Sequence, residues 1–464
     1  MPPAPSQTNI PAPFPGSSPP VPGGPGFVGI PTLTLPGAFA PTVATVRGAT
    51  LEFHPTLRVA EEYTDNFYQT TSGSDENYRS IFGPGFTLFL NGARTFGTLS
   101  TTLDLVHDTA PNSGDDVKFF PSASAALRYA LTPRMAITFS DTYVRNDEPT
   151  AADQFGIRRG RQIFDTNAFS AALDWILDRW ATQLYYRNVL FFNENAEGQT
   201  QPGTNNSNDT VTNIVGLNVS TRIATDYIVR GGYEFSDVSQ LNGTTQESTG
   251  GDNTSHTGFG SVSRQIGLYG SGGLSTSYSY QTQDSTNIWN ISVFGAYGLP
   301  TGLSLYGAVG YSLLNSDTET NDGMFSANAN ASYRFATRAV ISVGVFQDFR
   351  QSAQQGQNFG TVQTRSYFGS FLYQLTPFIN TVARVTYSEN EGTGTGNNQN
   401  GGTAKTLTYG ATLNWQILRW LTTSLQYTYT NQTGNNFNQG NAGATGGTGD
   451  YSENRATINF FATF

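Results

Sequence analysis

The chain has 464 residues, of which only 12% are charged and 13% aromatic, and its formal net charge is −10. Soluble globular proteins carry about 25% charged residues, and a bilayer-spanning helix needs about 20 consecutive apolar residues, a run that is absent here. The acidic balance argues against nucleic-acid binding, which requires clustered Lys and Arg, and the absence of cysteine excludes disulfides, thiolate metal sites and cysteine nucleophiles.

The first 49 residues differ from the rest of the chain in their proline content. Thirteen of the 22 prolines lie between Pro2 and Pro41, and proline favours extended segments without regular backbone hydrogen bonds. We therefore expect residues 1–49 to form a Pro-rich periplasmic leader, with an ordered strap against the following domain as the alternative. A secretory signal has a basic start and about 7–15 apolar residues, and no such export signal is visible in the sequence.

From Thr50 to the end, apolar and polar residues alternate with a period of two. Leu425 and Tyr427 fall on one face of a strand, for example, and Gln426 on the other. Because successive side chains of a strand point to opposite faces, each segment has one apolar and one polar surface. The expected strands, about 20 with a range of 18–22, are Leu51–Tyr63, Ile81–Leu90, Thr95–His107, Val117–Leu131, Met135–Asn146, Ile163–Ile176, Trp180–Phe192, Val211–Arg222, Asp226–Val238, His256–Ile266, Ser271–Gln283, Asn287–Gly298, Leu303–Asn315, Met324–Phe335, Ala339–Arg350, Thr361–Leu375, Ile379–Glu389, Thr403–Ile417, Leu421–Thr430 and Arg455–Phe464.

The links between these strands alternate between short and long. Leu131–Arg134 and Leu375–Pro377 are short, whereas Asn193–Asp209 and Gln432–Gly449 are long, polar and rich in Gly, Asn or Asp. Bacterial outer-membrane barrels have short periplasmic turns and long extracellular loops. We therefore predict an all-β chain in which residues 50–464 form a closed antiparallel transmembrane β-barrel, surrounded by outer-membrane lipids and lipopolysaccharide.

Aromatic residues mark two further features of such a barrel. Trp175, Trp180, Trp415 and Trp420 flank two Arg-containing turns, and Trp suits a membrane interface because its ring is apolar while its N–H stays in water. The last predicted strand ends on Phe464, as is typical of outer-membrane barrels. We expect the barrel-assembly machinery to recognise Phe464; ordinary sheet packing of this ring is the alternative.

If the apolar faces meet lipid, the polar faces line the lumen. The candidate lumen-lining residues are Arg58, Arg128, Arg187, Arg230, Arg334, Arg350 and Arg384, with the carboxylates Glu52, Asp104, Glu234 and Asp348. A guanidinium in a wet lumen can bind carboxylates or sugar hydroxyls. Equally, these arginines could pair with neighbouring carboxylates and merely solvate the wall.

Candidate catalytic groups are sparse. His107 lies between Asp104 and Asp108, but no serine with a clear partner accompanies it, and a catalytic triad is defined by geometry. No two of the three histidines have the spacing of metal ligands. We therefore expect neither an enzyme nor a metal or cofactor site.

The segment Arg58-Val-Ala-Glu-Glu-Tyr-Thr-Asp-Asn66 resembles the first strand of the second-type β-barrel porin family of the bacterial outer membrane. Together with the alternating strands and the Phe464 end, the resemblance extends from about residue 50 to the end of the chain. It implies the barrel fold. Because some members are linked to exopolysaccharide export, it also implies polysaccharide-export components as partners.

Two functions fit this reading. The first is a porin-like channel for passive passage of hydrophilic solutes, with polysaccharide export as a special case; the second is a non-conducting structural or adhesive barrel. Barrels of about 16–18 strands enclose an aqueous channel, whereas 22-stranded transporters carry a plug, and about 49 leader residues are too few for a folded plug domain. An extracellular β-solenoid would need a repeat of constant length, which the irregular spacing does not provide.

Overall fold

The computed structural model describes residues 42–46, 49–69, 75–110, 117–147, 163–194, 209–241, 253–282, 285–300, 302–317, 322–336, 338–354, 357–392, 403–435 and 450–464. They form strands and turns, and they include no helix long and apolar enough to cross a membrane. The strands are β1 (Thr42–Val46), β2 (Ala49–Thr64), β3 (Asn77–Gly92), β4 (Thr95–Asp108), β5 (Lys118–Thr132), β6 (Met135–Asn146), β7 (Ile163–Leu177), β8 (Trp180–Glu194), β9 (Thr210–Arg222), β10 (Tyr227–Gln240), β11 (Asn253–Ile266), β12 (Gly270–Gln281), β13 (Thr286–Gly298), β14 (Leu303–Asn315), β15 (Asp322–Phe335), β16 (Ala339–Gln354), β17 (Gln357–Thr376), β18 (Ile379–Gly392), β19 (Thr403–Leu418), β20 (Leu421–Asn435) and β21 (Tyr451–Thr463).

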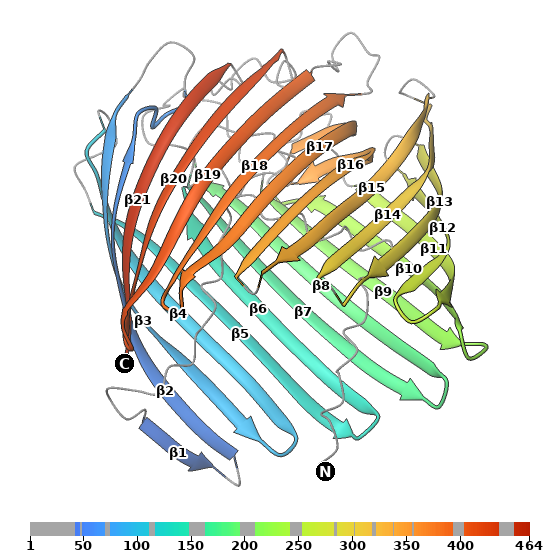
Figure 1. The fold of residues 1–464 in the computed structure, drawn as a ribbon, viewed down its shortest axis with the longest axis horizontal. Coiled ribbons are helices and arrows are strands. Elements are labelled where there is room, and N and C mark those ends of the chain that lie inside the picture. Colours follow the sequence, from blue (N-terminus) through green and yellow to red (C-terminus); the bar gives the residue numbers. More distant parts are fainter. Residues whose placement is uncertain are drawn as a thin grey trace.

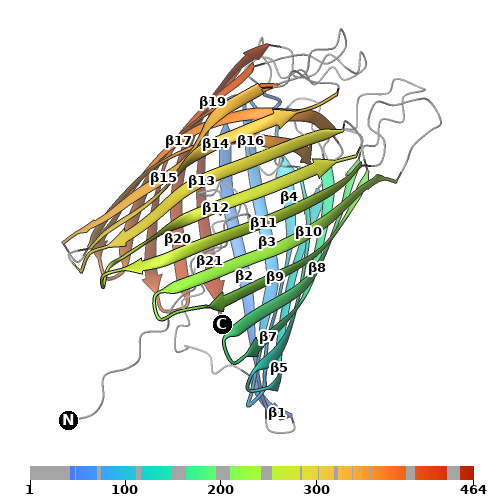
Figure 2. The same ribbon diagram turned by 90° about the vertical axis from the view of Figure 1, so that its right-hand side faces the viewer.

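Strands β2 to β21 close into one antiparallel barrel of 20 strands (Figure 1). Each strand pairs with its neighbours along the chain, and β2 pairs with β21 to complete the ring. The prediction of an all-β closed barrel of about 20 strands is confirmed. The strands cross the barrel obliquely (Figure 2), as closure of a sheet requires.

Strand β1 lies outside the ring. It pairs only with the first residues of β2, from Thr42↔Phe53 to Val46↔Ala49. It falls within the segment that the sequence assigns to the leader, whereas residues 1–41 lie outside the described part of the chain.

The two ends of the barrel differ in their connections. At the end that we call the turn end, nine hairpins are joined by two to four residues, among them Pro133–Arg134 and Asp178–Arg179. Asp178 has φ +39° and Ala336 has φ +57°, a left-handed backbone that tight hairpin turns require. Most residues that connect the strands at the opposite end, the loop end, lie outside the described residues, and so do most of the predicted long loops.

The pairing register sorts the side chains onto two faces, because directly paired residues of neighbouring strands project from the same face. Val59 pairs with Phe460 and Phe82, and all three are about 40–50% exposed apolar side chains. Arg58 projects from the other face and reaches across β3 to Asp104 on β4, with 2.7 Å between Nη1 and Oδ2. Hydrogen bonds between side chains two strands apart recur on this face, as in Tyr185–Glu234 and Ser312–Asp348. The concave side of a barrel brings such side chains closest, so Arg58 lies on the inner face and Val59 on the outer face.

The barrel has no central apolar core among the described residues; two small clusters take its place. Ala60, Ile81, Val106 and Phe120 form one on the inner faces of β2–β5. Ile288, Leu314, Met324 and Phe349 form the other, near the loop ends of β13–β16. Most large apolar side chains instead lie exposed on the outer face.

Candidate functional site: the lumen wall

The register assigns the candidate lumen residues to a common face. The inner-face positions include Arg58, Arg128, Arg187, Arg230, Arg334, Arg384, Glu52, Asp104, Glu234 and Asp348. Arg350 occupies an inner-face position of β16 in the same register, but its side chain lies outside the described residues.

Several inner arginines have no carboxylate partner. The exposed side chains of Arg128, Arg187 and Arg384 form no ion pair with any described residue. Arg187 lies over the Tyr185 ring, with 5.0 Å from Cζ to the ring centroid. These guanidinium groups therefore face the open space of the lumen.

By contrast, three of the four candidate inner carboxylates accept a hydrogen bond from a neighbouring side chain. Asp104 accepts a hydrogen bond from Arg58, and Glu234 accepts one of 2.5 Å from the Tyr185 hydroxyl. Asp348 accepts one of 2.6 Å from the Ser312 hydroxyl, and Glu52 lies 3.7 Å from His54 Nε2. The sequence left open whether the lumen arginines pair with carboxylates or stay available to solutes, and both cases occur. Arg58 is paired, whereas Arg128, Arg187 and Arg384 have no carboxylate partner among the described residues.

Inner-face glycines make these contacts possible. Gly83 on β3 separates Arg58 from Asp104, and Gly216 on β9 separates Tyr185 from Glu234. A Cβ at Gly83 would meet the Asp104 carboxylate, and one at Gly216 would meet the Tyr185 ring. Because glycine has no side chain, residues two strands apart can touch across it.

The loop end of the lumen is packed with a buried charge cluster that the sequence analysis missed. Arg79 on β3 donates to both oxygens of Asp108 at 2.7 and 3.0 Å and to both oxygens of Asp147 at 2.9 and 2.6 Å. The three side chains are at most 4% exposed, and Lys118 lies 3.4 Å from Asp108. The predicted strand that corresponds to β3 began at Ile81, so Arg79 fell outside it; extending the alternation by two residues would have placed Arg79 inside.

The segment after β2 folds inward onto this cluster. Phe67 is 2% exposed, and its ring centroid lies 5.6 Å from the Arg79 guanidinium carbon. Gln69 Nε2 donates to Glu453 on β21, and Thr64 donates to the same carboxylate. Together these contacts fill the lumen beside β2, β3 and β21.

A row of tyrosines lies on the outer face toward the loop end, along β6–β13 and β20–β21. In five places a tyrosine hydroxyl hydrogen-bonds, at 2.5–2.8 Å, to a polar side chain on the next strand, one outward position nearer the loop end. The pairs are Tyr143–Asp165, Tyr186–Asn213, Tyr233–His256, Tyr278–Asn287 and Tyr427–Asn454. Each phenol thus has its ring on the apolar side of the row and its hydroxyl on the polar side. Trp289, which the sequence analysis did not single out, lies in this row, with its ring tilted against that of Tyr278 and the two centroids 4.6 Å apart.

The predicted interface tryptophans lie at the turn end. Trp175, Trp180 and Trp415 occupy outer-face positions and are 43–51% exposed. Trp420 belongs to the turn between β19 and β20, and its ring stacks on Phe464 with centroids 5.7 Å apart. The Phe464 N–H also donates to the Pro55 carbonyl, so this residue is anchored across the β2–β21 seam.

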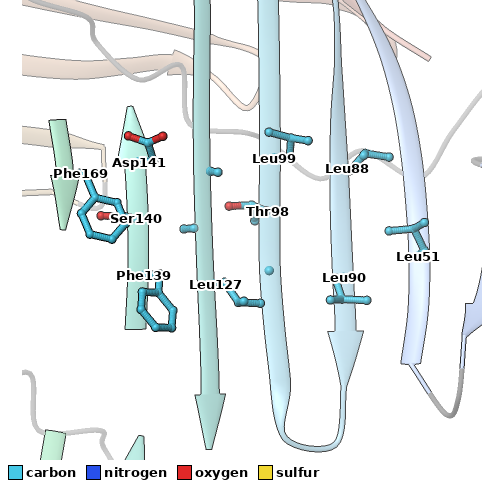
Figure 3. Close-up of a pocket in the computed structure, with 13 residues that line it drawn as sticks. Leu51, Leu88, Leu90, Thr98, Leu99, Leu127, Phe139, Ser140, Asp141 and Phe169 are labelled. Atoms are coloured by element: carbon cyan, nitrogen blue, oxygen red, sulfur yellow. The ribbon is translucent and has the colours of Figure 1, made fainter. Parts of the chain in front are cut away.

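Between the two aromatic rows the outer face is apolar. A shallow groove over β2–β7 shows this surface, lined by Leu51, Leu88, Leu90, Leu99, Leu127, Phe139 and Phe169 (Figure 3). Asp141 lies at its edge and accepts a hydrogen bond from Asn167.

The candidate acid–base pair is not assembled. His107 projects from the outer face of β4, whereas Asp104 and Asp108 project from the inner face. No group of three or more metal-ligating side chains occurs within the described ranges.

Comparison with known proteins identifies the fold but no family. No protein-family model matches the chain, and no curated protein matches it either. The resemblance to the second-type β-barrel porin family is therefore not confirmed.

Solved structures with a similar fold do exist. The siderophore receptor PirA from Acinetobacter baumannii matches with a TM-score of 0.51 at 9% identity over 89% of this chain and 80% of that one. A mutant ferric enterobactin receptor (PfeA) from Pseudomonas aeruginosa, in complex with enterobactin, matches with a TM-score of 0.51 at 10% identity over 89% and 81%. The FrpB iron transporter from Neisseria meningitidis gives 0.50 at 10% identity over 88% and 82%. At such identities the likeness concerns the fold alone: this chain shares a large β-barrel with these receptors and this transporter.

Proposed function

We propose that this chain is an outer-membrane channel through which hydrophilic solutes pass passively, with a preference for anions. The observation that carries the proposal is the contrast between the two faces. The outer face is apolar between a tyrosine row and tryptophans, as a lipid-facing band is. The inner face exposes guanidinium groups that no described carboxylate neutralises.

The anion preference follows from the distribution of charge along the open wall. A fixed cation in a water-filled passage lowers the energy of a passing anion and raises that of a cation. Arg128, Arg187 and Arg384 are exposed, whereas Asp104 is paired with Arg58. Glu234 keeps its charge, because the Tyr185 hydroxyl that donates to it is neutral, but it is partly buried. The mobile solute therefore meets more free positive charge than free negative charge.

Planar-bilayer recording tests both parts of the proposal. The purified barrel should give single-channel steps, and its reversal potential in a KCl gradient should have the sign of anion preference. The double variant Arg187→Glu with Arg384→Glu should shift that potential toward cations. Arg264→Glu is the matched control, because Arg264 projects from the outer face at the turn end and pairs with Asp226. Cation preference in the wild type, or equal shifts in both variants, would contradict the anion assignment.

An outer-membrane channel would have two kinds of partner. Outer-membrane lipids and lipopolysaccharide would surround the barrel, and the barrel-assembly machinery would recognise Phe464. Phe464→Ala should reduce the yield of heat-modifiable barrel in the outer-membrane fraction. Phe460→Ala, on the outer face of the same strand, should not. Equal yields of the two variants would contradict recognition of Phe464 by the assembly machinery and leave it only a packing role against Trp420.

A more specific form of this proposal is that the channel exports polysaccharide. It is supported by the family resemblance and by the ability of guanidinium groups to bind sugar hydroxyls. Oligosaccharides added on one side of the bilayer should then interrupt the current. Current that is unaffected by neutral and acidic oligosaccharides would remove the export version and the polysaccharide-export partners, while leaving the ion channel intact.

The second candidate function is a non-conducting structural or adhesive barrel. The filled loop end favours it, because the inner-face residues Asn77, Ser312 and Asn390 have no exposed surface. The same recordings separate the two functions: a correctly folded barrel that stays silent would support the structural role.

A further inference from the structure

The barrel wall is open between β15 and β16 at the loop end. The ladder between these strands stops at Ala327↔Gln347, although β15 continues to Asp322 and β16 to Gln354. Strand β15 stays paired with β14 as far as Leu314↔Asp322, and β16 stays paired with β17. The β16–β17 hairpin is therefore the part that leaves the wall.

The hairpin end turns into the lumen. Phe349 belongs to the same face of β16 as Val343, which is 50% exposed on the outer face. Phe349 itself is 4% exposed and packs with Ile288, Leu314 and Met324, which are inner-face residues of β13–β15. An outer-face residue can reach inner-face residues only if its strand has passed inside the wall. Figure 2 shows the ends of these strands behind β13–β15.

Side chains satisfy the backbone groups that the interrupted ladder leaves free. Gln347 Nε2 donates to the Phe325 carbonyl at 2.9 Å, and the Gly323 N–H donates to the Asp322 carboxylate at 2.7 Å. On β16 the Phe349 N–H donates to the Asp348 carboxylate at 2.8 Å. Unpaired backbone groups at a strand edge lower the stability of a fold. These three hydrogen bonds replace missing ladder bonds and so stabilise the interruption.

The same register also defines a second position for the hairpin. If the β15–β16 ladder continued past Gln347, Phe349 would lie opposite Phe325, which is 56% exposed on the outer face. Phe349 thus has two apolar environments, one inside against Leu314 and Met324 and one outside beside Phe325. A segment with two alternative packings of this kind is a two-state element.

We propose that the strand ends beyond the last rung of the β15–β16 ladder, Asp348–Gln354 of β16 and Gln357–Thr364 of β17, act as a gate. In the inner position, held by Asp348–Ser312 and by the Phe349 cluster, it narrows the lumen. When β16 instead pairs with β15 along its full length, the hairpin is part of the barrel wall and the lumen is wider. This proposal rests on the proposed channel function and adds its regulation and size limit.

Paired cysteines can hold the gate in either position, and the chain offers a clean background because it has no cysteine. Ser312→Cys with Asp348→Cys holds the inner position, and Phe325→Cys with Phe349→Cys holds the wall position. Ser275→Cys with Ser292→Cys is the control, since these paired inner-face serines of β12 and β13 have hydroxyls 2.7 Å apart and both stay in the wall. Disulfide formation is measured by thiol alkylation before and after reduction.

The readout is single-channel conductance before and after reduction. The wall-position disulfide should raise conductance by about twofold or more because it clears the lumen, and the inner-position disulfide should abolish the largest steps of the wild type. The control pair should conduct equally in both redox states. Phe349→Ser, which weakens the inner position without any crosslink, should also raise conductance.

The outcomes separate this proposal from the channel itself. If the wild type conducts but neither disulfide changes the conductance, or if the Phe325/Phe349 pair never crosslinks, the gate is wrong and the channel stands. A silent wild type with a conducting Phe349→Ser variant supports the gate, because it shows a lumen closed by the hairpin. Silence of every folded variant overturns both the gate and the channel.

Discussion

The two ends of the lumen are built differently although the same strands form both. Near the turn end, the inner-face side chains of Arg128 and Arg384 are exposed and unpaired among the described residues. Near the loop end, inner-face residues such as Asn77 and Gln432 are at most 1% exposed, and charges form a bidentate cluster around Arg79. The difference indicates that the wall alone leaves a wide passage, and that inward-folded segments at one end determine what can cross it.

The strongest test of this contrast removes the central cation of the packed end. Arg79→Leu leaves the carboxylates of Asp108 and Asp147 buried without their bidentate partner, and breaking a buried ion pair costs about 3–5 kcal/mol. We expect the free energy of unfolding to fall by this order, as measured by urea unfolding of the barrel in lipid vesicles. Lys118 and Asn77, which also contact Asp108, should keep the loss toward the lower end.

Arg128→Leu is the control from the open end. Its guanidinium is exposed and has no carboxylate partner within the described chain, so the stability change should stay within about 0.5 kcal/mol. Equal losses for Arg79→Leu and Arg128→Leu would mean that the two ends do not differ energetically.

A smaller loss of stability is expected when an inner-face glycine of the open wall is replaced by alanine. Gly216→Ala places a methyl group on the Tyr185 ring, which must move and lose its hydrogen bond to Glu234. Overpacking of this kind costs about 1–3 kcal/mol. The same unfolding measurement on Gly258→Ala, an outer-face site with no atom within 4 Å of the added Cβ, should show no loss. A comparable loss at Gly258 would refute the role of inner-face glycines.

The smallest effect concerns the tyrosine row. Tyr186→Phe removes the hydroxyl that donates to Asn213, and the net contribution of such a bond is about 1 kcal/mol. Tyr311→Phe is the matched substitution, because the Tyr311 hydroxyl forms no hydrogen bond with the described residues. Unfolding midpoints should therefore be lower for Tyr186→Phe than for Tyr311→Phe; the reverse order would count against the row as a polar boundary.

The closed 20-strand architecture was predictable because a strand of a wide barrel has one apolar and one polar face along most of its length. Alternation around Val343 and Leu425 carries that information directly. The alternation weakens at the loop end. There β3 and β21 extend through Arg79 and Glu453, but outer-face positions such as Ser80 and Asn454 are polar, so the apolar–polar pattern is no longer visible. These two predicted strands therefore began four residues too late, at Ile81 and Arg455 instead of Asn77 and Tyr451, and the buried cluster was missed.

The inward hairpin could not be predicted for a different reason. The alternation of β16 continues through Gln347 and Phe349 without interruption, so nothing local tells that the strand has left the wall. Only the three-dimensional contact of Phe349 with Leu314 and Met324 reveals it. The pairing of Asp348 with Ser312, two strands away, is equally invisible to local pattern.

One pair of neighbouring residues tests most directly whether the apolar side faces acyl chains while the polar side faces water. Ser342 and Val343 are successive residues of β16 on opposite faces, and no native cysteine interferes. In lipid vesicles, Ser342→Cys should react with a membrane-impermeant maleimide. Val343→Cys should resist it, and a fluorophore attached there before reconstitution should be quenched by brominated lipid. Equal aqueous labelling of the two positions would contradict the transmembrane barrel.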